Sequence, residues 1–413
     1  MNPGAMPFRP QMGPGGFGGP MGPPMGRGGP PPQGPPPQDD FGPNAPGGGL
    51  EGLNIGPGAQ YPPKDAKLPS PLQPAQTQEL MGHRKKVLSV AWNRTGRKLA
   101  SGGQDNEVRI WPIDPATFRH RAPPEVVLQG HTDAAERVAW DPTAEQTLAS
   151  TGGDKTVRLW DARAGKLAQT VATTGDNINL CWHPDGQTLA VSNRDDVISF
   201  IDVRKGKVKN TKKFQFEVNE MTWSADGELF MLTTGGGNVD IRSYPDMEEH
   251  YTCRAHTAGV YCIDLQPGGE HFAVGSADAL VSIWWAPEYI CVRTMPRLEK
   301  PICGLSFSHD GRWLASVSGE NIVDICETDT AEYVHHVGPV KFTVSTIAWN
   351  PKYPLLAIGG EDRDGGGPNA PREQRDYEGA IRVFGYMPKE AQRDAPPPPA
   401  ARGERAKAPM ELD

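Results

Sequence analysis

Few residues in this sequence combine the types and spacing that catalysis needs. Residues 13–18 match G-x-G-x-x-G, but Pro14 interrupts the stretch and no strand or helix pattern flanks it, so a dinucleotide-binding loop is not indicated. Asp195 and Asp196 resemble a catalytic carboxylate pair, but we interpret them as part of an acidic turn. The sequence has no G-x-S-x-G, P-loop or H-E-x-x-H motif. We therefore expect no enzymatic activity and no cofactor.

Residues that bind metals or form disulfides are scattered along the chain. None of the six cysteines forms a C-x-x-C pair, and His335-His336 has no cysteine or acidic cluster beside it. The N-terminus lacks the apolar segment of a signal peptide, and no apolar run approaches the ~18 residues of a membrane span. We expect a reduced intracellular protein with no metal site, disulfide framework or membrane segment.

A concentrated basic stretch, residues 203–213, is the strongest local signal for binding. Its function is either contact with RNA phosphates or contact with an acidic protein partner. The alternative is an exposed edge strand that lysines keep soluble. Of the two partners we favour the protein, because the chain has a net charge of −8 and an acidic body disfavours tight RNA binding. The candidate residues are Arg204, Lys205, Lys207, Lys209, Lys212 and Lys213.

The elements that would position these residues repeat along the chain. Each unit has an alternating apolar segment ending in an aromatic residue or Leu, a short Leu-Ala-type segment, an acidic turn and a second alternating segment. A period of roughly 40–45 residues with four short strands is typical of a WD-repeat propeller blade. We predict an all-β fold, a seven-bladed WD-repeat β-propeller. The anchors that end the first segment are Trp92, Trp140, Trp182, Trp223, Leu265, Phe307 and Trp349.

The ends of the repeat array predict how the ring closes. We expect residues 76–82 to supply the outer strand of the last blade, because closure removes an exposed sheet edge. In the seventh unit the second anchor, Phe384, lies farther from Trp349 than in the other units. We therefore predict a loop insertion at 361–379. The basic stretch 203–213 falls on the outer strand of the third blade and the turn before it, on the rim.

WD-repeat proteins share a buried tetrad of His, Ser, Asp and Trp, and two units of this sequence carry those residue types at the matching positions. A buried imidazole and carboxylate need partners, and an indole N–H needs an acceptor. The fifth unit keeps His256, Asp278 and Trp284 but has Val274 at the serine position, so we predict an incomplete network there. The two tetrads are His83, Ser101, Asp105 and Trp111, and His131, Ser150, Asp154 and Trp160.

Two further features bear on binding. Residues 160–163 fit W-D-x-R, a motif that in some propellers docks to the adaptor of a cullin ubiquitin ligase. A substrate receptor of such a ligase is therefore an alternative function, for which Arg163 is the informative residue. In the fifth unit Trp285 follows Trp284, and it serves either as an exposed interface anchor or as packing under the next turn.

Composition divides the chain into three parts. Gly and Pro make up most of the first 50 residues, and four consecutive prolines lie among mixed charges near the C-terminus. Segments of this kind cannot bury a core. We therefore predict a disordered Gly/Pro-rich tail over residues 1–75, the propeller over 76–387, and a disordered Pro-rich charged tail over 388–413.

Six segments are more distinctive than the general blade pattern. They are DNINLCW (176–182), PDGQTLA (184–190), DDVISFID (195–202), FEVNE (216–220), GSADALVSIW (275–284) and LSFSHDG (305–311). These segments resemble those of the THO complex subunit 3 family of WD-repeat proteins. The resemblance extends from about Val87 to Phe384. The resemblance implies a non-enzymatic scaffold in the nucleus that supports mRNP assembly and mRNA export. It also implies large helical THO subunits and a DEAD-box helicase as partners. Separately from the resemblance, we expect RNA contact to be weak or indirect.

Overall fold

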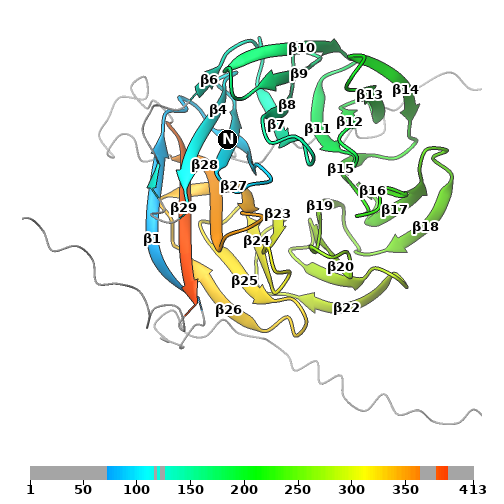
Figure 1. Ribbon diagram of the computed structural model, residues 1–413. Helices are drawn as coiled ribbons and strands as arrows, with labels where there is room; N and C mark the ends of the chain where they lie inside the picture. The colour runs from blue at the N-terminus through cyan, green and yellow to red at the C-terminus, as the bar shows by residue number, and fades with distance from the viewer. Residues whose placement is uncertain (1–71, 116–118, 121–125, 363–377, 389–413) are drawn as a thin grey trace, which may run out of the picture. The chain divides into compact units, whose positions relative to one another are not determined.

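Seven antiparallel β-sheets form the part of the chain that the structure describes. This computed structural model describes residues 72–115, 119–120, 126–362 and 378–388. The sheets follow one another around a ring as the blades of a propeller (Figure 1), and the described residues contain no helix. The predicted seven-bladed fold is therefore confirmed. Nearly all of both predicted tails, and most of the insertion predicted at 361–379, lie outside the described residues.

The first three blades begin with the strand nearest the central channel. In the first blade the outer position is divided between two short strands, both of which pair with β4. Blade one consists of β2 (Val87–Trp92), β3 (Lys98–Gly103), β4 (Val108–Asp114), β5 (Arg119–His120) and β6 (Val126–Leu128). Blade two consists of β7 (Ala135–Trp140), β8 (Thr147–Gly152), β9 (Thr156–Asp161) and β10 (Lys166–Ala172). Blade three consists of β11 (Asn177–Trp182), β12 (Thr188–Asn193), β13 (Val197–Asp202) and β14 (Lys207–Lys213).

The next three blades repeat the same up-and-down order of four strands. Blade four consists of β15 (Val218–Trp223), β16 (Leu229–Thr234), β17 (Asn238–Ser243) and β18 (Glu249–Arg254). Blade five consists of β19 (Val260–Leu265), β20 (His271–Ser276), β21 (Val281–Trp285) and β22 (Ile290–Met295). Blade six consists of β23 (Ile302–Phe307), β24 (Trp313–Ser318), β25 (Val323–Glu327) and β26 (Tyr333–Val337).

The seventh blade closes the ring with a strand from the other end of the chain. β27 (Phe342–Trp349), β28 (Leu355–Asp362) and β29 (Glu378–Pro388) are completed by β1 (Leu72–Met81), which pairs antiparallel with β29. The predicted closure is therefore present, although β1 begins at Leu72, inside the segment that we assigned to the tail. It extends that far because β29 offers pairing partners as far as Pro388. The insertion predicted in this blade lies between β28 and β29.

All seven predicted anchors occupy the last position of the innermost strand of their blade. In three blades the anchor is a Trp whose indole N–H donates to the preceding blade, to the backbone carbonyl of the residue before that blade's anchor. The pairs described are Trp92 with Ala348 (3.1 Å), Trp140 with Ala91 (3.0 Å) and Trp182 with Ala139 (3.0 Å). The repeated tryptophans therefore join neighbouring blades as well as filling the core between them.

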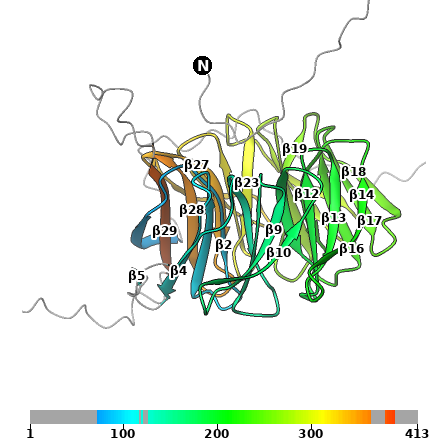
Figure 2. The same ribbon diagram turned by 90° about the horizontal axis from the view of Figure 1, so that it is seen from above.

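The up-and-down order gives the propeller two faces, visible from the side in Figure 2. One face carries the turns between the first and second and between the third and fourth strands of each blade, and we call it the turn face. The opposite face, the crossover face, carries the turns between the second and third strands and the links from blade to blade. The apolar core lies between adjacent sheets, with large buried side chains such as Trp111, Trp160 and Phe200.

Candidate functional site

The four residues of the first predicted tetrad meet at the crossover face of blade one. The Nδ1 atom of His83 lies 3.0 Å from Asp105, its Nε2 atom lies 2.7 Å from Ser101 Oγ, and the Trp111 indole donates to the same Oγ at 2.9 Å. Burial alone would raise the pKa of Asp105. The hydrogen bond and charge of His83, with the backbone N–H of Arg84, outweigh this and lower that pKa.

The second predicted tetrad has the same geometry in blade two. His131 Nδ1 lies 3.0 Å from Asp154 Oδ2, its Nε2 lies 2.7 Å from Ser150 Oγ, and Trp160 donates to that Oγ at 2.8 Å. Burial lowers the pKa of His131 although Asp154 opposes this effect. Both tetrads join the link between blades to the inner strands of one sheet, which is a structural role and involves no exposed reactive atom.

The predicted gap in the fifth blade is filled by a residue that we did not consider. His256 Nε2 lies 2.8 Å from Ser282 Oγ, and the Trp284 indole donates to that Oγ at 2.8 Å. Our prediction of an incomplete network was wrong, because Ser282 on β21 lies directly opposite Val274 on β20. The hydroxyl therefore reaches the same place from the neighbouring strand. His256 Nδ1 completes the tetrad at 3.1 Å from Asp278.

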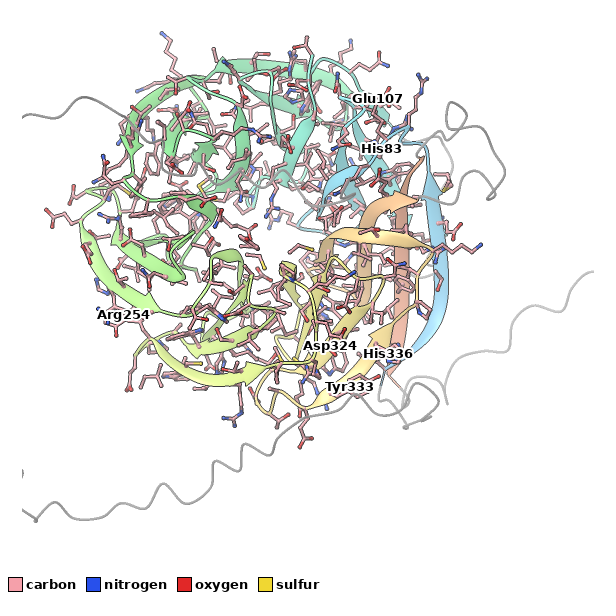
Figure 3. All side chains as sticks on the ribbon, turned by 180° about the vertical axis from the view of Figure 1, so that it is seen from behind. His83, Glu107, Arg254, Asp324, Tyr333 and His336 are labelled. Atoms are coloured by element: carbon pink, nitrogen blue, oxygen red, sulfur yellow. The ribbon has the colours of Figure 1, made fainter. Side chains whose placement is uncertain are left out.

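Blades four and six hold a buried ion pair at the strand position that Ser282 occupies in blade five. In blade four, Arg242 Nε donates to Asp240 at 2.8 Å, and in blade six Arg297 Nη2 donates to Asp324 at 2.7 Å. Asp324 is only 2% exposed. Figure 3 shows it beside Tyr333 and His336 in blade six. We did not predict these pairs, because their acidic and basic residues have no common spacing in the sequence.

The central channel contains a second group of charged side chains. It is a cavity of about 550 Å³ lined by the inner strands, and Arg137 from blade two forms a salt bridge there with Glu220 from blade four. Glu220 also accepts a hydrogen bond from the Ile263 backbone N–H at 3.0 Å, and Asp264 accepts one from Phe307 at 2.8 Å. Burial raises the pKa of Asp264 to about 7. These carboxylates connect neighbouring blades.

The predicted basic residues lie on the third-blade rim, on β14 and the turn before it. Two of the lysines are engaged within the chain: Lys209 donates to Thr188 Oγ1 at 2.8 Å, and Lys212 donates to the Met247 carbonyl at 3.1 Å. Lys205 makes a loose ion pair of 3.7 Å with Asp202. The side chains that remain exposed and have no ion-pair partner among the described residues are Arg204, Lys207 and Lys213. The surface available to a partner is therefore smaller than the sequence suggests.

Exposed basic residues of blade two extend this rim surface. Gln169 on β10 lies against the turn that contains Gly206, so the outer strands of blades two and three are neighbours here. Exposed Arg163 lies in the blade-two turn, and exposed Lys166 is the first residue of β10. We had assigned Arg163 to a different motif and did not consider Lys166, because only the packing of the blades brings them toward β14. We call Arg163, Lys166, Arg204, Lys205, Lys207 and Lys213 the basic rim.

The W-D-x-R segment presents only part of its sequence to solvent. Trp160 is 2% exposed and Ala162 is 4% exposed, so Asp161 and Arg163 are the residues that a partner can reach. Asp161 accepts hydrogen bonds from the backbone N–H groups of Arg163 and Ala164, at 2.8 and 3.0 Å. These two bonds lower the pKa of Asp161, and they fold its side chain into the turn.

Trp285 is neither a fully exposed interface anchor nor a fully buried packing residue. Its side chain is half-buried and packs edge to face on His271 of β20, with ring centroids 5.0 Å apart. Among the described residues, no group of three or more His, Cys, Asp or Glu side chains is arranged to hold a metal ion. The described residues also form no helix that is long and apolar enough to cross a membrane.

Comparison with known proteins gives the family of the chain. Residues 83–359 match the family model described as the THOC3 beta-propeller domain. The chain is 45% identical over 316 residues to THO complex subunit 3 of Arabidopsis thaliana, covering 76% of this chain and 97% of that protein. It is 33% identical over 331 residues to WD repeat-containing protein AAC3 of Dictyostelium discoideum, covering 75% of this chain and 67% of that protein.

A solved structure shares the fold at low sequence identity. The β-propeller domain of Cps50 (Swd1) from Myceliophteria thermophila superposes with a TM-score of 0.62 and 18% identity, covering 76% of this chain and all of that domain. The family match spans most of the propeller, from the first tetrad histidine into β28. The chain therefore belongs to the THO complex subunit 3 family of WD-repeat propellers.

Proposed function

We propose that this protein is a non-enzymatic scaffold subunit of the nuclear THO/transcription–export complex. The observation that carries the proposal is the 45% identity to a THO complex subunit 3 over nearly the whole length of that relative. In this role the propeller supports co-transcriptional mRNP assembly and mRNA export. Its buried polar groups have a structural role, because they hold neighbouring strands and blades together. The surfaces available to partners are the rim and the two faces of the propeller.

The partners that we propose are the large helical THO subunits, with the DEAD-box helicase present in the same assembly. RNA contact is weak or indirect, since the basic rim has few free cations and the chain has a net charge of −8. The basic rim is suited to an acidic surface of one of the subunits. Rim charges act mainly on the rate and specificity of such association rather than on folding.

Affinity purification of the full chain from nuclear extract tests this function. We expect the helical THO subunits to co-purify, and crosslinking of the intact complex to locate one of them near β14. Recovery of a cullin adaptor without THO subunits would instead favour the ligase-receptor alternative, for which exposed Asp161 and Arg163 are the support. Replacing Arg163 with Ala would then abolish adaptor binding.

A further inference from the structure

An exposed aromatic surface lies on the rim where blades four and five adjoin. Tyr251 on β18 is 46% exposed, and Ile290 at the start of β22 is 52% exposed. The rings of Tyr251 and Tyr289 are stacked, with centroids 4.9 Å apart and planes inclined by 18°. β18 and β22 follow each other along the rim in Figure 1. We call Tyr251, Tyr289 and Ile290 the tyrosine shelf.

The backbone of Tyr289 is in a conformation that is unfavourable for a residue with a large side chain. Its φ is 56°, in the left-handed region, where the corresponding turns of blades two and three have Gly165 and Gly206. A bulky residue is unfavourable in this conformation. In blade four the same position is occupied by Met247, which is 2% exposed and fills the core. Tyr289 is partly buried: its ring packs against the core shared by blades four and five, lies edge-on to His250 with centroids 5.9 Å apart, and stacks on exposed Tyr251. Backbone strain of this kind also occurs at binding sites.

Exposed acidic residues lie in the turns beside the tyrosine shelf. The turns of blades four and five on the turn face carry exposed carboxylates, and none of them forms a salt bridge within the described part of the chain. Burial raises the pKa of Tyr289, and Cys253 and Asp226 add to this effect. The exposed acidic residues are Asp226, Glu228, Asp246, Glu248, Glu249 and Glu288.

The combination of tyrosine rings and nearby carboxylates favours a particular kind of ligand. Stacked tyrosine faces beside carboxylates suit a guanidinium, which is planar, always charged and able to stack on a ring while bonding to carboxylates. The chain's own tails have no net positive charge, because residues 1–71 and 389–413 each contain equal numbers of acidic and basic residues, and we therefore favour a partner protein as the source of the cation. We propose that the tyrosine shelf docks an arginine-bearing segment of a partner protein, with an apolar neighbour of that arginine against Ile290. This docking does not depend on assembly into the THO complex.

Peptide binding to the full-length protein tests the proposal. The probe is a fluorescein-labelled Gly/Ser peptide with two Leu-Arg pairs, and the matched probes replace arginine by citrulline or by lysine. We expect saturable binding of the arginine peptide by fluorescence anisotropy, about tenfold weaker for citrulline and weakened by salt. Lysine should bind with intermediate affinity, because it retains the charge without the planar group.

Two variants and one control localise the binding. Tyr289→Gly introduces the glycine found in the turns of blades two and three, so we expect it to fold and to bind the arginine peptide about tenfold more weakly. Tyr251→Ser removes the other ring and should have a similar effect. Leu167→Ser alters an apolar residue that is 43% exposed on the rim of blade two, and it should bind as the wild type does.

Several outcomes would overturn the proposal. These are no saturable binding of the arginine peptide, equal binding of the citrulline peptide, and equal loss in Leu167→Ser and Tyr289→Gly. Tighter binding of a proline-rich peptide would assign the rings to a different ligand. Self-association of the wild-type chain that Tyr289→Gly abolishes, measured by sedimentation velocity, would assign the shelf to a second copy of the protein.

Discussion

Removal of the Ser282 hydroxyl tests how the fifth blade is held together. In Ser282→Ala, the Nε2 atom of His256 and the indole N–H of Trp284 both lose a partner that lies at 2.8 Å. Ser282 is 1% exposed and Trp284 is 7% exposed, so water cannot readily replace the hydroxyl. Each buried polar group left without a partner costs about 1–3 kcal/mol, so with two such groups the free energy of unfolding should fall by about 2–6 kcal/mol.

The position of Val274 supplies a rescue experiment. In blades one and two the tetrad hydroxyl comes from the second strand, at Ser101 and Ser150, and Val274 is the matching residue of blade five. The double variant Val274→Ser with Ser282→Val exchanges the two side chains across the same pair of strands. We expect it to recover more than half of the stability lost in Ser282→Ala, and a double-mutant cycle measures this coupling.

Urea unfolding followed by circular dichroism gives the stability change. Hydrogen exchange of β20 to β22 shows whether the loss is confined to blade five. Ser192→Ala is the matched control, because Ser192 is fully buried and its Oγ has no hydrogen-bond partner among the described residues. We expect this control to be nearly neutral. Equal losses for Ser282→Ala and Ser192→Ala would show that the Ser282 hydroxyl does not hold the blade together.

Three further perturbations follow from the same structure. Trp160→Ala should lower the free energy of unfolding in urea by about 3–5 kcal/mol, since it removes a buried ring and the donor to Ser150, and an unchanged midpoint would contradict the tetrad's role. Asp264 has a folded-state pKa of about 7, above its unfolded value, so its contribution to stability is lost as pH rises from about 4 to 7. Asp264→Asn keeps an acceptor for Phe307 and should be more stable than the wild type at pH 8 by up to about 4 kcal/mol, because a pKa raised by about three units is equivalent to that free energy. The gain should shrink toward pH 5, and a pH-independent difference would refute this assignment. Charge reversal of Lys205, Lys207 and Lys213 to Glu should leave the melting temperature nearly unchanged and remove the protein from the purified THO assembly. If assembly and RNA binding both persisted in this variant, these lysines would act only to keep the strand soluble.

Local patterns in the sequence were sufficient for the architecture. All seven anchors end an innermost strand, because alternation and a terminal aromatic residue are properties of a single strand and repeat with every blade. The types and spacing of His, Ser, Asp and Trp likewise identified two tetrads, since each residue holds a fixed place in its blade. The lysines of β14 were placed on the rim for the same reason.

The sequence by itself determined the fold class, the number of blades and the elements that carry the candidate residues. Only the tertiary structure decided which strand supplies the fifth-blade hydroxyl, which lysines are already bonded, and which aromatic rings from different blades stack. These contacts depend on the register between strands and on the packing between blades. Ser282 supplies the hydroxyl from the strand paired with that of Val274, and Lys212 donates a hydrogen bond to the next blade. Tyr251 stacks on Tyr289, which belongs to a different sheet. Periodicity along one chain cannot specify them, because the same spacing is compatible with several partners until neighbouring sheets pack together.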